Sequence, residues 1–232
     1  MILIPLQQFG LGDVLYCQTL IRNLMEKGDK VLWPVMPQFV EGLNRAFPDM
    51  TFIPGDITAI NFEDRRDYVS GECRYIPIRW ADTILKVPYR MCMRSKYDLY
   101  EMDHETWAEK GMWARDAKRE MLLLESLVPA NGEYNLVNKY FGSHSQFKAD
   151  IKIDNDLPVI EMKSIPGFSL MDWALVIQNA ATIHTVSTSI IYMLEQLELR
   201  AKYVDLYTRR PIETNFENID YILKKHKYNF HY

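Results

Sequence analysis

Two short turns in the sequence combine residue types that can act on a substrate. Gly10-Leu11-Gly12-Asp13 follows the apolar start of the chain, and Ser187-Thr188-Ser189 follows the apolar stretch 182–186. An ionised carboxylate can take a proton from an attacking hydroxyl group. Hydroxyl and backbone N–H groups at the start of a helix form a natural phosphate site. The two turns therefore indicate a general base and a phosphate-binding site.

The first turn has two readings. Gly10 and Gly12 allow a sharp turn and the close approach of a ligand to the backbone. Asp13 stands at the start of an expected helix, where the helix dipole favours a negative charge, so it can serve as a base or simply cap the helix. The dinucleotide-binding pattern G-x-G-x-x-G is incomplete because Leu15 occupies its third position, which argues against NAD.

Basic residues near other strand ends can complete a diphosphate site. Lys139 follows the expected strand 134–140, and Arg209 follows the strand 202–206. An arginine can hold a phosphate through two parallel hydrogen bonds, although solvated surface charges are the usual alternative for both residue types. An ordinary helix cap explains one hydroxyl of the second turn, but not all three. Glu195 can hold sugar hydroxyls or lie on a solvated helix face, and His184 is expected in the core.

The elements that position these turns alternate between strands and helices. In the first half we expect strands at 2–4, 30–35, 50–53 and 73–78. We expect helices from Val14 up to the stop at Lys27-Gly28-Asp29, over 37–47 and over 103–128. Pro129-Ala130-Asn131-Gly132 then breaks the chain. In the second half we expect strands at 134–140, 148–153, 157–162, 182–186 and 202–206 and helices at 169–181, 190–199 and 218–225. Such alternation predicts an α/β protein with two Rossmann-like halves facing a cleft, divided into domains 1–130 and 131–232.

Composition excludes several classes of protein. The chain has 232 residues and a net charge of -4, which argues against a nucleic-acid partner. Its apolar runs are shorter than the roughly 20 residues of a membrane helix, and its start does not resemble a signal peptide. Three cysteines without CxxC spacing indicate neither a disulfide framework nor a zinc site, so we expect a cytoplasmic protein. No Asp-x-Asp pair stands at an expected strand end, so we expect no metal.

At its two turns the sequence resembles the heptosyltransferase-like glycosyltransferases of the GT-B fold. Members of this group begin with a strand, a Gly-Asp turn and a helix, which corresponds here to ILIPLQQFGLGDVL. The group's proposed catalytic base maps to Asp13. The chain is about a third shorter than is usual for the group, and in this it looks like glycosyltransferases of large DNA viruses.

The group's donor-binding turn, Asp-Thr-Gly-x-x-His, corresponds here to residues 187–192. Only Thr188 is kept, since Ser187 replaces the aspartate, Ser189 the glycine and Tyr192 the histidine. The resemblance implies an inverting, metal-independent hexosyl- or deoxyhexosyltransferase that needs no cofactor.

The partners that the resemblance implies are a nucleotide-diphosphate sugar bound by the second domain and a glycan or other hydroxyl acceptor on the side of the first. Gly10, Gly12, Lys139, the hydroxyl turn and Arg209 are the expected donor-binding residues. Two alternatives stay open. One is a sugar-nucleotide epimerase, and the other is a non-catalytic nucleotide-binding or assembly protein on the same fold.

Overall fold

The computed structural model describes residues 1–7, 10–55, 67–78, 92–129, 132–141, 147–209 and 215–232. Its contacts divide the chain into two compact units. The first is Met1–Ala114 with Glu217–Ile219, and the second is Arg115–Phe216 with Asp220–Tyr232. This division assigns residues 115–129, which we expected in the first domain, to the second unit.

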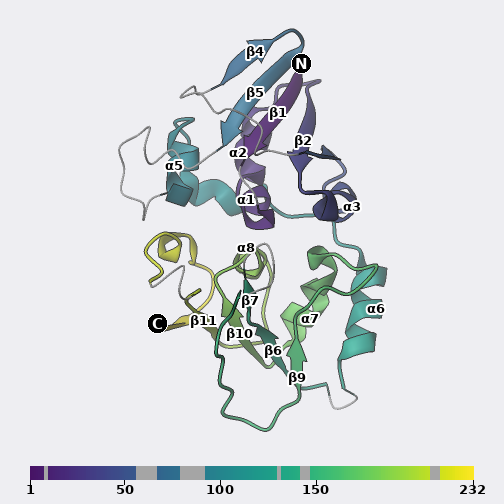
Figure 1. Ribbon diagram of the computed structural model, residues 1–232, viewed down its shortest axis with the longest axis vertical. Helices are drawn as coiled ribbons and strands as arrows, with labels where there is room; N and C mark the ends of the chain where they lie inside the picture. The colour runs from purple at the N-terminus through teal and green to yellow at the C-terminus, as the bar shows by residue number, and fades with distance from the viewer. Residues whose placement is uncertain (8–9, 56–66, 79–91, 130–131, 142–146, 210–214) are drawn as a thin grey trace. The chain divides into compact units, whose positions relative to one another are not determined.

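The first unit is built on a five-stranded sheet with the order β3-β2-β1-β5-β4. Figure 1 shows β1 between β2 and β5. All pairs are parallel except β4–β5, which is an antiparallel edge. The strands are β1 (Ile2–Gln7), β2 (Lys30–Val35), β3 (Thr51–Pro54), β4 (Tyr68–Ser70) and β5 (Cys73–Ile78). The helices are α1 (Leu11–Tyr16), α2 (Gln18–Leu24), α3 (Pro37–Ala46), α5 (Cys92–Asp98) and the 3₁₀ helix η3 (His104–Ala108).

Alternate side chains of β2 are buried in the core of the first unit. Val31, Trp33 and Val35 are buried, while Lys30 is exposed. The Trp33 ring stacks on the Phe52 ring of β3 with centroids 5.7 Å apart. Aromatic side chains bury large apolar areas, so this pair anchors the edge strand β3 to the core.

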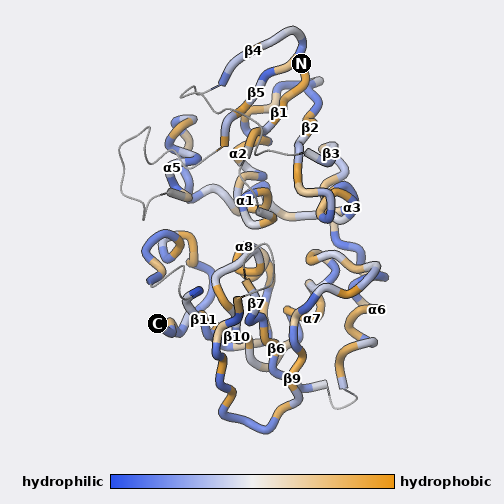
Figure 2. The backbone as a smooth tube through the Cα atoms, viewed as in Figure 1, coloured by the Kyte–Doolittle hydropathy of each residue, from blue (hydrophilic) through white to orange (hydrophobic). Residues whose placement is uncertain are grey.

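The second unit is built on a fully parallel sheet with the order β12-β11-β10-β6-β9. Its strands are β6 (Asn135–Asn138), β9 (Val159–Glu161), β10 (Thr182–Val186), β11 (Val204–Tyr207) and β12 (Tyr228–His231). A small hairpin pairs β7 (Tyr140–Phe141) with β8 (Phe147–Lys148). The helices are α6 (Ala117–Leu127), α7 (Ala174–Asn179), α8 (Ile190–Leu194) and the 3₁₀ helices η4 (Leu170–Trp173) and η5 (Asp220–Ile222). Figure 2 shows hydrophobic residues along α7 and α8.

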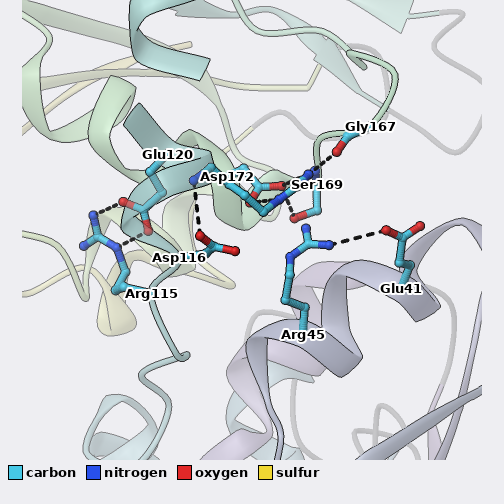
Figure 3. Close-up of polar contacts among 9 residues, drawn as sticks. Glu41, Arg45, Arg115, Asp116, Glu120, Gly167, Ser169 and Asp172 are labelled. Atoms are coloured by element: carbon cyan, nitrogen blue, oxygen red, sulfur yellow. Dashed lines mark hydrogen bonds and ion pairs between the residues drawn. The ribbon is translucent and has the colours of Figure 1, made fainter. Parts of the chain in front are cut away.

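Two arginines attach α6 to the rest of the second unit, Arg115 through Gln178 and Arg119 through Asp172. Figure 3 shows Arg115 beside Glu120 of α6. Arg115 pairs with the buried Glu120 and also donates to Gln178 Oε1 at 2.8 Å. Arg119 Nε lies 3.1 Å from Oδ1 of the buried Asp172, and its guanidinium also donates to the Gly167 carbonyl. A buried carboxylate such as Asp172 requires a charged or hydrogen-bonding partner. Because Arg119 of α6 supplies this partner, α6 packs with the second unit.

The long helix expected over 103–128 is wrong. Asp103 caps a helix as its position suggests, accepting a hydrogen bond from Glu105 N, but this helix is the short η3. The chain then runs without helix to Asp116, the N-cap of α6. Within α6, Leu123 is buried while Met121 is 44% exposed.

Most other expected strands are confirmed with shifts of one or a few residues, and β2, β5 and β10 match their expected bounds. Three expectations in the second half are wrong. Residues 149–153 form no strand, and the helix expected over 218–225 is reduced to η5. The sequence pattern also predicts no strand at 228–231, where the structure has β12. The expected α/β class with two Rossmann-like halves is confirmed.

Candidate functional site

Asp13 lies in the first turn of α1, at the carboxyl end of β1. Gly10 occupies the N-cap position, so the interpretation of Asp13 as the N-cap residue is wrong. Backbone N–H groups of Asp13 and Val14 donate to the Gly10 carbonyl at 3.1 and 3.3 Å. These bonds close the first turn and leave the Asp13 carboxylate available to side chains and ligands.

A buried lysine that the sequence did not single out holds this carboxylate. Lys96 Nζ of α5 forms an ion pair with Asp13 Oδ1. The Lys96 side chain is 1% exposed, whereas the Asp13 side chain is 22% exposed. A lysine is almost never fully buried unless it is paired, so the carboxylate and the ammonium stabilise each other.

Contrary to the expectation from the sequence, Gly10 and Gly12 are not needed for a sharp turn of the backbone. Gly10 has an extended backbone (φ -176°, ψ 141°), which any residue adopts, so the turn does not need a glycine for its conformation. A Cβ at Gly10 would instead lie 3.0 Å from Asp13 Oδ2. Gly10 therefore leaves space beside this oxygen. Gly12 lies inside α1, one residue before Asp13.

The thiol of Cys17 is a further titratable group beside this pair. Cys17, one turn further along the chain, is fully buried, and burial raises the pKa of its thiol to about 12 while the Lys96 charge opposes this. The thiol is therefore neutral at physiological pH. It does not compete with the Asp13 carboxylate as a base.

The hydroxyl turn of the second unit joins β10 to α8. Asn138 Nδ2 donates to Thr185 Oγ1 at 2.9 Å and to Thr188 Oγ1 at 3.0 Å. Ser187 is buried, whereas Thr188 and Ser189 are partly exposed. Ser189 is the N-cap of α8, and its hydroxyl makes no capping hydrogen bond. Thr188 and Ser189 are therefore the accessible hydroxyls of the turn, and Asn138 is a neighbour that the sequence did not reveal.

Lys139 follows β6, the strand beside β10 in the sheet, and its ammonium is already paired with a carboxylate. Its ammonium pairs with Glu161 at the end of β9, and this hydrogen bond raises the pKa of Lys139 and lowers the pKa of Glu161. Lys139 Nζ also lies 5.4 Å from the centre of the Tyr140 ring. A phosphate at this position would have to share the lysine with Glu161.

The parallel strands bring these residues to one edge of the second sheet. Lys139 follows β6, Ser187 follows β10 and Arg209, which is partly buried, stands just after β11. Carboxyl ends of parallel strands meet at the same edge, where open α/β sheets bind their ligands. The expected donor-binding residues of the second unit therefore share one edge.

Glu195 does not lie on a solvated helix face and is not free to hold a sugar. It is 7% exposed and accepts hydrogen bonds from the backbone N–H groups of Lys224 and Lys225 at 2.8 and 2.9 Å. Tyr228 Oη donates to its second oxygen at 2.6 Å. Glu195 instead fastens the chain before β12 to α8.

His184 is a core residue, as expected, within a row of polar side chains across three strands. Its Nδ1 lies 3.5 Å from Asp205 Oδ2, and His231 Nε2 lies 2.8 Å from Asp205 Oδ1. Burial lowers the pKa of His184, while the Asp205 charge opposes this. His184 is therefore neutral at physiological pH.

We expect His184 to make the free energy of unfolding depend on pH. Because the pKa of His184 is lower in the folded protein than its ordinary value of about 6.5, the unfolded chain binds the proton more tightly. Stability is therefore lost as the pH falls below about 6.5. His184→Gln should lose less stability than the wild type between about pH 7 and pH 5.5, measured by urea unfolding.

A remaining slope in that variant is expected from His104, whose pKa is also lowered by burial. Asp205, His231 and Asp154 are the neighbouring titratable groups that act on His184, and all three stay in place in the variant. If the free energy of unfolding of His184→Gln fell with pH as steeply as that of the wild type, this histidine would not control the loss of stability in acid.

A surface cavity of about 300 Å³ lies at the opposite edge of the second sheet. Glu133, Thr182, Arg200 and Lys202 are among its lining residues. They precede or begin strands β6, β10 and β11. The cavity is thus separate from the edge that carries the hydroxyl turn.

Within the described ranges, the structure contains no group of three histidine, cysteine, aspartate or glutamate side chains that could hold a metal ion. Among the same residues, no helix is long and apolar enough to cross a membrane. Arg210 and His144 lie outside the described residues.

One solved structure resembles this chain over almost its full length. It is described as the glycosyl transferase family 9 from Veillonella parvula DSM 2008. The match covers 99% of this chain and 86% of that chain with a TM-score of 0.56 and 8% sequence identity. Neither a protein-family model nor a curated protein matches the sequence. At this identity the likeness establishes a shared fold.

Proposed function

We propose that this protein is an inverting, metal-independent glycosyltransferase that uses a nucleotide-diphosphate sugar and a hydroxyl acceptor. The observation that carries this proposal is the partly exposed Asp13 carboxylate, held by Lys96 at the carboxyl end of β1. The shared fold with a protein described as a glycosyl transferase supports it, because open α/β sheets bind ligands at the carboxyl ends of their strands, where Asp13 and the hydroxyl turn lie.

In the proposed reaction Asp13 takes the proton of the acceptor hydroxyl as its oxygen attacks the anomeric carbon. The bond between that carbon and the diphosphate breaks, and the electron pair leaves with the nucleoside diphosphate. A single displacement of this kind inverts the anomeric centre. The base needs no metal to act, and no Asp-x-Asp pair stands at an expected strand end of the sequence to bind one.

The second unit would hold the donor at the edge of its sheet. Thr188 and Ser189 present accessible hydroxyls, and their neighbour Asn138 fixes the turn through Thr188. Arg209 and Lys139 would offset the charge that develops on the leaving diphosphate. For Lys139 this requires that the phosphate compete with Glu161 or displace it.

Thermal unfolding with nucleoside diphosphates tests this proposal. A ligand that binds only the folded protein raises its stability, by about 2.7 kcal/mol at 100 times its dissociation constant. We expect one of UDP, GDP, ADP and dTDP to raise the melting temperature, with the same shift in the presence and absence of magnesium. A matched variant, Lys202→Met, changes a lysine at the opposite edge of the sheet and should give the same shift.

The pairing of Lys139 with Glu161 favours a second candidate, a nucleotide-binding protein without transfer activity, since this lysine is already neutralised. Such a protein would show the same thermal shift but would not turn over a nucleotide sugar. Release of nucleoside diphosphate in the presence of acceptor separates the two candidates. No shift with any diphosphate would contradict both.

A further inference from the structure

The ion pair between Lys96 and Asp13 is arranged so that solvent reaches only the carboxylate. Lys96 is 1% exposed and Asp13 is 22% exposed. A substrate that approaches from solvent can therefore contact Asp13 without contacting Lys96. The ion pair with Asp13 is thus a route by which Lys96 can act on a reaction at this site.

The position of the Lys96 ammonium is fixed by the packing of α5 against α1. Tyr97, the next residue, is fully buried, and its hydroxyl donates to the Tyr16 carbonyl at 2.8 Å. The rings of Tyr97 and Tyr16 also meet edge to face with centroids 5.1 Å apart. These contacts hold the two helices together beside the ion pair, so the ammonium cannot follow the carboxylate freely.

The two oxygens of Asp13 face different surroundings. Oδ1 accepts the contact from Lys96. Oδ2 lies 3.0 Å from the point that a Cβ at Gly10 would occupy, so the absent side chain leaves space beside it. An acceptor hydroxyl can approach the oxygen that Gly10 leaves uncrowded more easily than the oxygen paired with the buried ammonium.

We propose that Lys96 is a positioning residue that holds Asp13 through Oδ1 and thereby presents Oδ2 to the acceptor hydroxyl. This inference rests on the proposed function, in which Asp13 is the base. A carboxylate fixed in one rotamer keeps its reactive oxygen within reach of the proton, and a displacement of about 1 Å can cost about 100-fold in rate.

The test compares the kinetics of Lys96→Met, Lys96→Arg and Asp13→Asn with those of the double variant Asp13→Asn/Lys96→Met. We expect Lys96→Met to lower kcat by about 10- to 100-fold with the donor KM unchanged. Lys96→Arg should recover part of the loss, because it restores a positive donor. In the Asp13→Asn background, Lys96→Met should cause no further loss, since residues that act through one another are not additive.

Two controls separate positioning from a general loss of structure. Lys110→Met removes another lysine of the first unit, whose ammonium donates to Asn23 at 2.6 Å at the surface, and should leave kcat unchanged. Lys96→Gln keeps a hydrogen-bond donor without a charge and serves if Lys96→Met does not fold. Thermal unfolding of each variant shows whether it is folded under the assay conditions.

The outcomes distinguish this inference from the proposed function. If Lys96→Met keeps the wild-type kcat, or if it lowers kcat equally in both backgrounds, the positioning role is overturned while Asp13 stays the base. If Asp13→Asn keeps full activity, the base assignment fails and the role of Lys96 fails with it. If the wild type transfers no sugar from any nucleotide sugar, the proposed function itself fails.

Discussion

Replacing Asp13 by asparagine is expected to lower the kcat of sugar transfer by about 10²- to 10⁴-fold, the usual contribution of a general base. Asparagine has nearly the shape of aspartate, and its amide cannot take a proton from the acceptor hydroxyl. The amide oxygen can still accept a hydrogen bond from Lys96, although the buried ammonium loses its counter-charge, so thermal unfolding of the variant is measured beside its rates. Initial rates with the donor identified by thermal unfolding measure the effect.

The donor site provides the internal control for this variant. Because Asp13 belongs to the first unit and the hydroxyl turn to the second, Asp13→Asn should show the same thermal shift with the nucleoside diphosphate as the wild type. Asp156→Asn, which changes an exposed aspartate, should keep wild-type rates. Asp13→Asn with wild-type kcat and an intact fold would show that another group accepts the proton.

The strands that position both turns were predictable from the sequence because their signals are local. Apolar runs such as Lys30–Val35 and Thr182–Val186 are short, uniform and bounded by turn residues, and the structure has both with their expected bounds. The order of strands and helices then limits the topology to parallel sheets with crossover helices. For these reasons the sequence predicted the α/β class with two halves.

The partners of the site residues were not predictable, because they depend on distant parts of the chain. Lys96 is 83 residues from Asp13, and a lysine in a polar stretch normally lies on the surface. Glu195 was expected on an exposed helix face, yet it binds backbone N–H groups about 30 residues away. A pattern of spacing indicates which face a residue occupies, but it does not indicate which segment packs there.

The expected domain boundary shows a related limit. Pro129 to Gly132 is a strong local break, and a break of this kind is a natural place for a boundary. The contacts of α6, however, depend on two arginines that reach other elements of the second unit, Arg119 to Asp172 and Arg115 to Gln178. The sequence marks where a helix ends, whereas side-chain contacts decide with which unit it packs.

Asp172→Ala is expected to have the largest effect on stability, lowering the free energy of unfolding by about 3 kcal/mol, as for other buried pairs that lose one partner. Asp172 is 3% exposed and pairs with Arg119 of α6, which is 28% exposed. Its Oδ2 also accepts hydrogen bonds from the N–H and the hydroxyl of Ser169 at 2.7 and 3.0 Å, which form the cap of η4. One substitution thus removes the link to α6 and the cap together.

Urea unfolding of Asp172→Ala, Asp172→Asn and Asp156→Ala separates these contributions. Asparagine can still accept the capping bonds, so Asp172→Asn should lose less stability than alanine, and the difference measures the cap at about 1 kcal/mol. Asp156 is exposed, and its loss should change stability by less than about 0.5 kcal/mol. If Asp172→Ala were as stable as the Asp156→Ala control, the contact with Arg119 would not hold α6 to the second unit. The assignment of residues 115–129 to that unit would then rest on apolar packing and on the hydrogen bond between Arg115 and Gln178.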